Sequence, residues 1–223
     1  MIEANEIFSD FDTRIALWCD AMADTSDIAM LADSVIENKI PLISVVPENV
    51  SFLWTCLEKT NVKMFARYFF ETSNKNIDND VSVLSKNIVS VLKQGADGIQ
   101  IFVKVRDFER VIDLLSLIRD DLFFDHKLCI VLNIQDIDVS NWDLVFEKLR
   151  EIRADSFGIH FDEDMGNRSD FIGRIYSMLQ HMDFDGDMHF MLGDNFDRID
   201  QVVRLTEALR PELSDKLHFF IEY

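Results

Sequence analysis

Glycine and cysteine are scarce in this sequence. Its 223 residues include 7 glycines, which is too few to favour a glycine-rich phosphate-binding loop. The 3 cysteines, Cys19, Cys56 and Cys129, lie far apart and form no Cys-x-x-Cys pair. Such a sparse and odd count is typical of buried, reduced thiols in a cytoplasmic protein rather than of a disulfide framework.

Positive charge is also in short supply. The chain has 22 Lys and Arg residues against 41 Asp and Glu residues, which gives a net charge of −19. Nucleic-acid binding depends on Lys and Arg that neutralise phosphates, so we expect no nucleic-acid partner. Anionic membrane surfaces are disfavoured for the same reason. A small anionic molecule stays possible as a substrate, because its site needs only one local cation.

Long apolar runs are missing as well. No stretch approaches the ~20 uncharged apolar residues that a membrane-spanning helix needs. The first residues, MIEANEIFSDFD, are acidic and lack the basic and then apolar layout of a secretion signal. We therefore expect no membrane partner and a cytoplasmic location.

Alternating hydrophobicity marks one strand with particular clarity, GIQIFVKVRD at residues 98–107. Ile99, Ile101 and Val103 occupy one parity, whereas Gln100 and Lys104 occupy the other. A period of two predicts a β-strand with one apolar side. The lysine side must then face water or line a site that uses the charge.

Strands of this kind alternate with amphipathic segments along the whole chain. The predicted strands are 15–21, 41–46, 62–70, 98–107, 128–137, 155–164, 187–193 and 216–223. The predicted helices are 24–39, 51–59, 80–95, 108–123, 140–153, 169–180 and 198–211. Strands that alternate with helices indicate parallel βαβ units.

Eight such strands predict an α/β fold of the (β/α)8 (TIM) barrel type, as a single domain over residues 1–223. A doubly wound open sheet is the alternative, but no Gly-x-Gly-x-x-Gly follows the first strand. The barrel would be short, because no eighth helix follows the last strand. The exposed flank could be covered by the N-terminal segment, with Ile2, Ile7, Phe8 and Phe11, or by a second copy in a homodimer.

A barrel strand turns one parity inward, and the carboxyl ends of the strands carry the active site in this fold. The apolar parity of 98–107 packs under the helices, so Lys104 should face the axis near that end. The same parity places further polar side chains at the upper rim: Asp20, Glu48, Arg67, Asn133, Gln135, His160, Asp162 and Glu222. A barrel filled only for stability would carry Val, Ile and Leu there, so this set predicts a small-molecule site.

Four of the inward-facing residues are candidates for a specific chemical role. Lys104, flanked by Arg67 and Arg106, is a candidate for a Schiff base with a carbonyl substrate, or else it neutralises Asp20 or Glu48. His160 and Asp162 lie two apart on one strand face and form a candidate acid/base pair. Arg67 is a candidate anchor for a carboxylate or phosphate, or else an ion-pair partner of Glu48.

Binding of a metal is the alternative chemistry, with His160, Asp162 and Glu222 as ligands. His-x-Asp alone is a weak signal for it, and we assign neither a metal nor a cofactor. Two further histidines, His189 and His218, come early in their strands and are interpreted as core residues low in the barrel with satisfied hydrogen bonds.

Residues 23–64, ADTSDIAMLADSVIENKIPLISVVPENVSFLWTCLEKTNVKM, resemble the opening of deoxyribose-phosphate aldolases, which are Schiff-base barrel enzymes. The shared features are a Thr and an Asp at the first helix, a strand that ends in Val-Pro, and a Thr-x-Val-Lys entry into the third strand. GADGIQI (95–101) and ADSFG (154–158) are similar to the family's entries into strands four and six. The resemblance implies a barrel with aldolase-type carbonyl chemistry.

The family's catalytic residues are not matched. The resemblance puts Gly158 at the position of the Schiff-base lysine, His189 at that of the second lysine and Gln100 at that of the strand-four acid. Transaldolase-like barrels carry their lysine on strand four, as Lys104 is here, by analogy of position. We therefore expect an aldolase-like lyase for a small carboxylated or phosphorylated carbonyl compound. The alternatives are a metal-dependent lyase or hydrolase, or a lapsed barrel that only binds a metabolite or protein.

Overall fold

The eight predicted strands close into one parallel barrel. The computed structural model describes residues 14–22, 24–70, 77–122, 125–161 and 168–223. Its strands are β1 (Ile15–Trp18), β2 (Leu42–Val45), β3 (Lys63–Phe70), β4 (Gly98–Val103), β5 (Lys127–Asn133), β6 (Ser156–His160), β7 (Asp187–Met191) and β8 (Leu217–Glu222). Each strand pairs with its neighbours in chain order, and β8 returns to pair with β1. The (β/α)8 prediction is confirmed.

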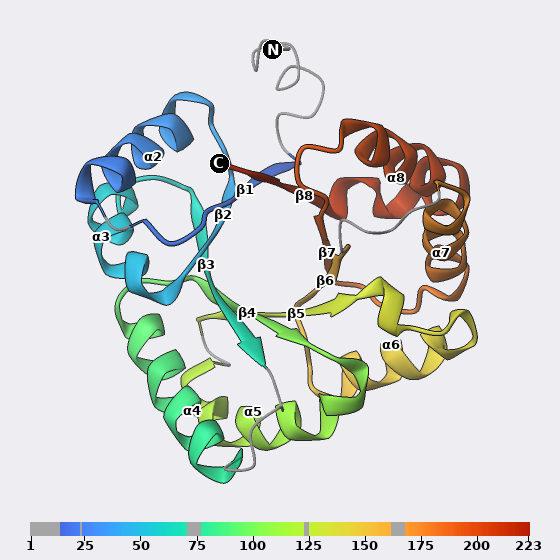
Figure 1. Ribbon diagram of the computed structural model, residues 1–223, viewed down its shortest axis with the longest axis horizontal. Helices are drawn as coiled ribbons and strands as arrows, with labels where there is room; N and C mark the ends of the chain where they lie inside the picture. The colour runs from blue at the N-terminus through green and yellow to red at the C-terminus, as the bar shows by residue number, and fades with distance from the viewer. Residues whose placement is uncertain (1–13, 23, 71–76, 123–124, 162–167) are drawn as a thin grey trace.

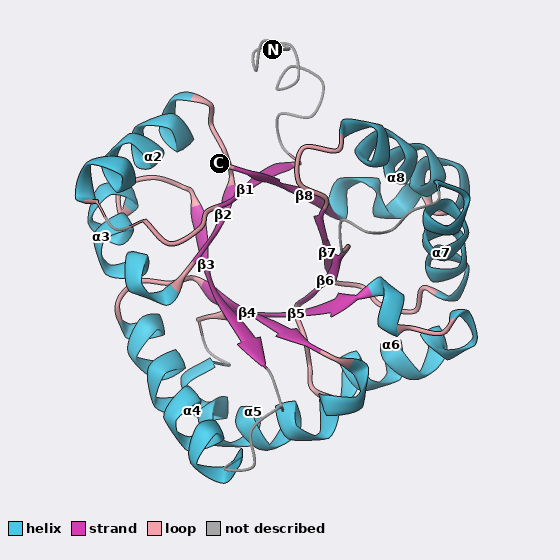
Figure 2. Cartoon of the chain, viewed as in Figure 1, coloured by secondary structure: helices cyan, strands magenta, loops and turns pink. Residues whose placement is uncertain are grey.

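Helices surround this ring of strands (Figure 1), and Figure 2 shows the strands in magenta inside a cyan layer of helices. They are α2 (Thr25–Glu37), α3 (Pro47–Leu57), α4 (Ile77–Lys93), α5 (Phe108–Leu122), α6 (Trp142–Glu151), α7 (Arg168–His181) and α8 (Phe196–Leu209). Short 3-10 turns occupy Val105–Asp107, Ile134–Asp136, Val139–Asn141 and Pro211–Lys216. None of the described helices is long and apolar enough to span a membrane.

The ends of the helices follow local sequence signals. Asp24 caps α2, because its carboxylate accepts a hydrogen bond from the backbone N–H of Ser26 (3.0 Å). Asn195 does the same for α8 by accepting from the N–H of Arg198. Gly95 follows α4 with φ of 111°, a backbone conformation that residues other than glycine rarely adopt. The two N-caps therefore mark where α2 and α8 begin, and Gly95 marks where α4 ends.

Strand parity sorts the core into two regions, as the sequence pattern indicated. Ile99, Ile101 and Val103 of β4 are buried in the large cluster between the strands and the helices. Phe102, of the opposite parity, belongs to a smaller cluster inside the barrel, and Gln100 is fully buried there. Lys104 itself lies one residue beyond β4 and is exposed. The inward parity of this strand is therefore confirmed for Gln100 and Phe102.

The seam between β8 and β1 is the flank that an eighth helix would cover. Within the described residues no helix follows β8. The outward side chains of the seam are nevertheless buried, with Ile15 and Phe219 at 0% exposure and Leu17 and Ile221 below 10%. The apolar residues that the sequence offered as a cover, Ile2 to Phe11, lie outside the described residues.

Candidate functional site

A cavity of about 580 Å³ opens at the carboxyl ends of β6, β7, β8 and β1. We call it the upper cavity. Its lining residues are Trp18, His160, Phe161, Met191, Leu192, Gly193, Asp194, Asn195, Arg198, Phe220 and Glu222. The volume suits a small metabolite, and this end of the barrel is where the fold carries its active sites.

Aromatic rings form one wall of the upper cavity. His160, the last residue of β6, has its ring centroid 6.5 Å from that of Trp18 and 6.0 Å from that of Phe102. Trp18 and Phe102 meet edge to face at 5.3 Å. His160 is half-buried, so its imidazole is accessible from the cavity.

Polar groups form a second wall of the cavity, at the start of α8. Gly193 has φ of 55° and leads through Asp194 into the cap residue Asn195. Arg198, in the first turn of α8, has its guanidinium carbon 5.3 Å from the centre of the Phe171 ring. This wall therefore combines a cation with the partial positive charge of a helix amino terminus.

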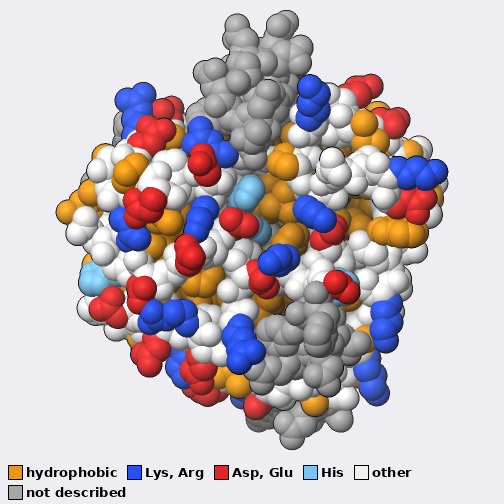
Figure 3. Space-filling view, turned by 180° about the vertical axis from the view of Figure 1, so that it is seen from behind, with side chains coloured by type: hydrophobic (Ala, Val, Ile, Leu, Met, Phe, Trp, Pro, Cys, Tyr) orange, Lys and Arg blue, Asp and Glu red, His pale blue; other side chains and the backbone are white. Residues whose placement is uncertain are grey.

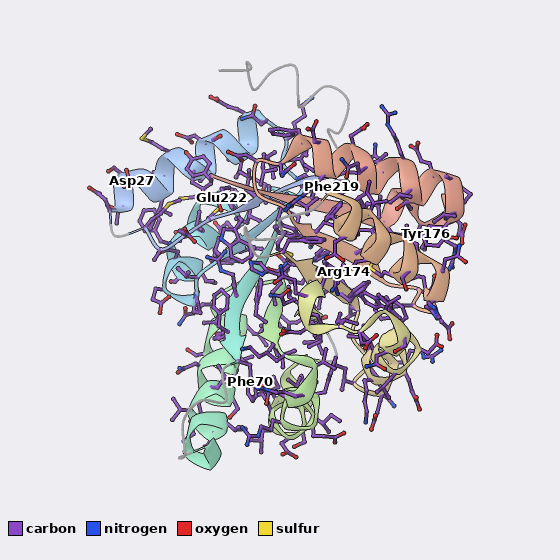
Figure 4. The ribbon with its side chains drawn as sticks, turned by 45° about the vertical axis from the view of Figure 1, so that its right-hand side comes forward. Asp27, Phe70, Arg174, Tyr176, Phe219 and Glu222 are labelled. Atoms are coloured by element: carbon purple, nitrogen blue, oxygen red, sulfur yellow. The ribbon has the colours of Figure 1, made fainter. Side chains whose placement is uncertain are left out.

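Glu222 completes the lining of the upper cavity. It is the last residue of β8 and lies beyond Phe219 on the same strand (Figure 4). A Cβ at Gly193 would lie 4.0 Å from Glu222 Oε1, so this carboxylate stands beside the turn that follows β7. The upper cavity thus presents an imidazole, carboxylates and a guanidinium to one space. These groups can transfer protons and hold an anionic group.

Arg67 lies behind the aromatic wall, almost completely buried at 4% exposure. Its guanidinium carbon is 3.7 Å from the centre of the Trp18 ring. One terminal nitrogen donates to the carbonyl of Cys19 (3.0 Å) and to the carboxylate of Asp20 (3.2 Å). Burial lowers the pKa of Arg67, and the Asp20 carboxylate opposes that shift. The predicted ion-pair partner, Glu48, is replaced by Asp20.

The remaining predicted residues lie apart from the upper cavity. Glu48 is exposed in the first turn of α3, and Lys104 is exposed where β4 meets the next turn. Asn133 ends β5, where its side chain accepts from the N–H of Gln135 (2.9 Å). Arg174 of α7, labelled in Figure 4, fixes the same turn through the carbonyls of Ile134 and Ile137. These four predicted residues do not line the upper cavity.

Two predicted residues are therefore in the upper cavity, His160 and Glu222. Asp162 lies outside the described residues, so the predicted metal set of His160, Asp162 and Glu222 is described only in part. Among the described residues no group of three His, Cys, Asp or Glu side chains could hold a metal ion. Sequence reasoning missed Asp194, Asn195 and Arg198. Their signal was a Gly-Asp-Asn turn directly after the seventh strand, which is an N-cap pattern at the active end of a barrel.

The interior below the upper cavity holds a chain of polar side chains. The Ser44 hydroxyl donates to Gln100 Oε1 at 2.5 Å, and Gln100 Nε2 lies 3.1 Å from His189 Nδ1. Cys129 Sγ lies 3.3 Å from the same nitrogen. His189 Nδ1 therefore has hydrogen-bond partners inside the barrel. His189 is thus a satisfied core residue as expected, whereas His218 Nδ1 is buried without a partner among the described residues.

Burial sets the charge of this interior. It lowers the pKa of His189 well below the ordinary value, with a smaller effect from His218, so the ring is neutral at pH 7. Burial also raises the pKa of the Cys129 thiol to about 12. The barrel interior therefore carries polar groups in their uncharged forms, which is the state that a low-dielectric environment favours.

Gly158, which the resemblance puts at the position of the Schiff-base lysine, is tightly enclosed. A Cβ at Gly158 would lie 2.9 Å from Val131 Cγ2 and 3.3 Å from Met191 Cε. Both neighbours belong to the apolar cluster inside the barrel. A long side chain at this position would displace them, so the barrel interior is packed for glycine.

Comparison of sequences finds no matching protein family and no curated relative. Solved structures match almost the whole chain. QR15, an aldolase, is 14% identical, with a TM-score of 0.71, and the match covers 96% of this chain and 91% of QR15. Deoxyribose phosphate aldolase from Aeropyrum pernix is 13% identical, with a TM-score of 0.65 and coverage of 95% and 86%.

The same comparison matches proteins with other descriptions. CutC from Streptococcus agalactiae, a candidate copper homeostasis protein, is 10% identical, with a TM-score of 0.66 and coverage of 94% and 98%. At these identities the likeness shows the fold alone. The expected resemblance to deoxyribose-phosphate aldolases is confirmed at that level: the chain has an aldolase-like TIM barrel and is divergent in sequence.

Proposed function

We propose that the upper cavity is the active site of a lyase with aldolase-like chemistry, acting on a small carbonyl compound that carries a carboxylate or a phosphate. The observation that carries this proposal is the meeting of His160, Glu222 and Arg198 around one space of about 580 Å³. Two of these residues transfer protons and the third binds an anion. The aldolase-like fold supports the reaction class without selecting a substrate.

Binding of the anionic group is assigned to Arg198 and the start of α8. Arg198 lines the upper cavity from the first turn of that helix, and the N–H groups there carry partial positive charge. Arg67 adds a second cation behind Trp18, where its Nε and one terminal nitrogen are buried without a partner among the described residues. This local positive charge offsets the acidic surface of the protein.

Proton transfer is assigned to His160 and Glu222. In aldol cleavage one group takes the proton of the β-hydroxyl, the carbon–carbon bond breaks, and its electron pair moves to the carbonyl oxygen. The resulting enolate then takes a proton at carbon from the other group. An imidazole and a carboxylate that line one cavity can divide these two steps.

Exchange of carbon-bound hydrogen tests this assignment, since enolate formation in D2O exchanges the hydrogens next to the carbonyl. Pyruvate and dihydroxyacetone phosphate are the charged probes, and acetone and dihydroxyacetone are the uncharged controls. We expect the protein to accelerate exchange in a charged probe. His160→Gln and Glu222→Gln should each slow exchange about a hundredfold. Arg198→Met should chiefly raise KM.

Lys104 supplies the control and the competing chemistry. It does not line the upper cavity, so Lys104→Met should exchange as fast as the unmodified protein. Borohydride reduction in the presence of pyruvate would trap any imine on Lys104, and mass spectrometry would locate it. An adduct on Lys104 would place the reaction at the end of β4 instead of in the upper cavity. Exchange no faster than in protein-free solution, or unaffected by either carboxamide variant, would contradict the proposal.

We also infer a cytoplasmic location and self-association. Cys19 and Cys129 are fully buried free thiols, which suits a reducing compartment. Exposed apolar side chains on neighbouring helices, Met30 of α2 and Trp54 of α3, support association of two copies. Sedimentation of the purified protein would measure its mass, and a monomer at all concentrations would contradict self-association.

A further inference from the structure

A second cavity, of about 350 Å³, lies at the opposite end of the barrel and plays no part in the proposed reaction. We call it the lower cavity. It is formed where the strands begin, with Leu42 of β2, Phe65 of β3, Ser156 of β6, Asp187 of β7 and His218 of β8 among its lining. His189 closes it from above. In Figure 3, which shows the molecule from behind, pale blue histidine atoms lie near the middle of the face, with acidic and basic side chains around them.

The walls of the lower cavity are apolar rings and uncharged polar groups. Phe65 and His189 meet edge to face with centroids 5.7 Å apart, and His189 and His218 do so at 5.5 Å. Ser156 is 3% exposed, and its Oγ lies by the Cys129 thiol with no nitrogen or oxygen partner among the described residues. His218 Nδ1 is equally unpartnered. Buried polar atoms without partners are costly, and a ligand that bonds to them would remove that cost.

The mouth of the lower cavity is acidic. Four aspartates and two lysines line it, which leaves a net charge of −2. Both lysines are already neutralised: Lys63 pairs with Asp97, and Lys127 pairs with Asp155, each at 2.8 Å. Asp125 and Asp187 have no ion-pair partner in the part of the chain that the structure describes. The charge left over at this mouth is therefore negative.

The protonation of the two histidines does not reverse this charge. Burial lowers the pKa of His218, which the nearby Asp187 carboxylate only partly opposes, and burial lowers that of His189 further. Both rings are thus neutral at pH 7 and offer flat faces and hydrogen-bonding nitrogens rather than positive charge. Among the described lining residues, an anion would meet no free cation, whereas a cation would meet two free carboxylates.

We propose that the lower cavity is a second binding site, for a small organic cation with an apolar body, such as an arylalkylammonium compound. The apolar part would fill the space between Leu42, Phe65 and the two histidine rings. The ammonium group would reach the mouth, where Asp187 is the carboxylate that also faces His218. An aromatic body packs well against the rings of Phe65 and the two histidines, and a carboxylate attracts the positive charge of the ammonium group.

Benzylammonium chloride is a probe of suitable size, and the histidine signals report where it binds. The ring signals of His189 and His218 in NMR spectra should shift and saturate as benzylammonium is added. Those of His160 in the upper cavity and of His181, which pairs with Asp143 on the outer surface, should stay in place. Benzyl alcohol should give the same pattern with weaker affinity, and benzoate should cause no saturable shift.

A matched pair of variants isolates the carboxylate. Asp187→Asn should weaken benzylammonium binding about tenfold in calorimetric titration and leave benzyl alcohol binding unchanged. Asp185→Asn is the control: it removes the same charge two residues away, from an aspartate that pairs with Lys216 outside the lower cavity. It should change the affinity less than twofold.

Three results would overturn the proposal. The first is the absence of saturable shifts at His189 and His218 with 10 mM benzylammonium, which would leave these rings as internal packing. The second is equal binding of benzoate. The third is an equal loss of affinity in the two aspartate variants, which would reduce the effect to the general charge of the protein. None of them bears on the hydrogen-exchange test of the upper cavity.

Discussion

The guanidinium of Arg67 stacks on the ring of Trp18, with 3.7 Å between the guanidinium carbon and the ring centre. Trp18 in turn faces the upper cavity and holds Asp20 through its indole N–H (3.2 Å). A buried charge is thus supported by an aromatic face, a carbonyl and one carboxylate. The arrangement joins β3 to the end of β1 and gives the cavity wall its rigidity.

Removing this cation should destabilise the fold. We expect Arg67→Ala to lower the free energy of unfolding by about 3 kcal/mol, because a buried cation–π contact and a hydrogen bond to the Cys19 carbonyl are lost together. Asp20→Asn should cost only a small fraction of that, since the Asp20 side chain is 87% exposed. Urea unfolding curves would measure both. Equal losses in the two variants would mean that the ion pair, not the stacking, holds Arg67.

Gly158 offers a test of the packing inside the barrel. Gly158→Ala should lower stability by roughly 1 to 3 kcal/mol, because the new Cβ would lie 2.9 Å from Val131 Cγ2. Val131→Ala removes that methyl group. The double variant should therefore be more stable than the two single losses predict when they are added. If the loss of stability in the double variant equals the sum of the two single losses, the two positions do not touch.

The buried His189 should make the fold sensitive to mild acid. Its folded-state pKa is depressed, so its contribution to stability is fully present above about pH 6.5, the unfolded value, and is lost as the pH falls toward the folded value. The free energy of unfolding should fall by up to ~1.4 kcal/mol per pH unit over that window. His189→Gln should remove this part of the slope. Identical pH slopes for the two proteins would contradict the assignment.

The three thiols should differ in reactivity. Cys19 and Cys129 are fully buried, and burial raises the pKa of each to about 12, so neither forms a reactive thiolate at pH 8. Cys56, on α3, is only half-buried. Iodoacetamide should therefore label Cys56 alone in the native protein and all three cysteines in urea, as mass spectrometry of peptides would show. Rapid native labelling of Cys129 would mean that the barrel interior opens.

Much of the barrel was predictable because periodicity is a local property. The alternation in 98–107 correctly assigned Gln100 and Phe102 to the interior. It could not show that β4 ends at Val103, one residue before Lys104. A strand that stops one residue early moves its last side chain from the barrel wall into solvent, and nothing in the alternation itself marks that end.

The partners of the site residues were harder to predict, because they depend on contacts between distant parts of the chain. Arg67 lies on β3 and pairs with Asp20, which follows β1, whereas the ion-pair partner suggested by the sequence was Glu48. Arg198 was overlooked because it was considered only as the first residue of the predicted helix 198–211. Only the barrel closure brings the first turn of α8 next to His160 and Glu222.

Crystals soaked with pyruvate, and separately with dihydroxyacetone phosphate, would test the central claim most directly. We predict density for the ligand in the upper cavity, with its charged group at Arg198 and its carbonyl between His160 and Glu222. An empty upper cavity together with ligand density at Lys104, or anywhere else on the barrel, would contradict the claim.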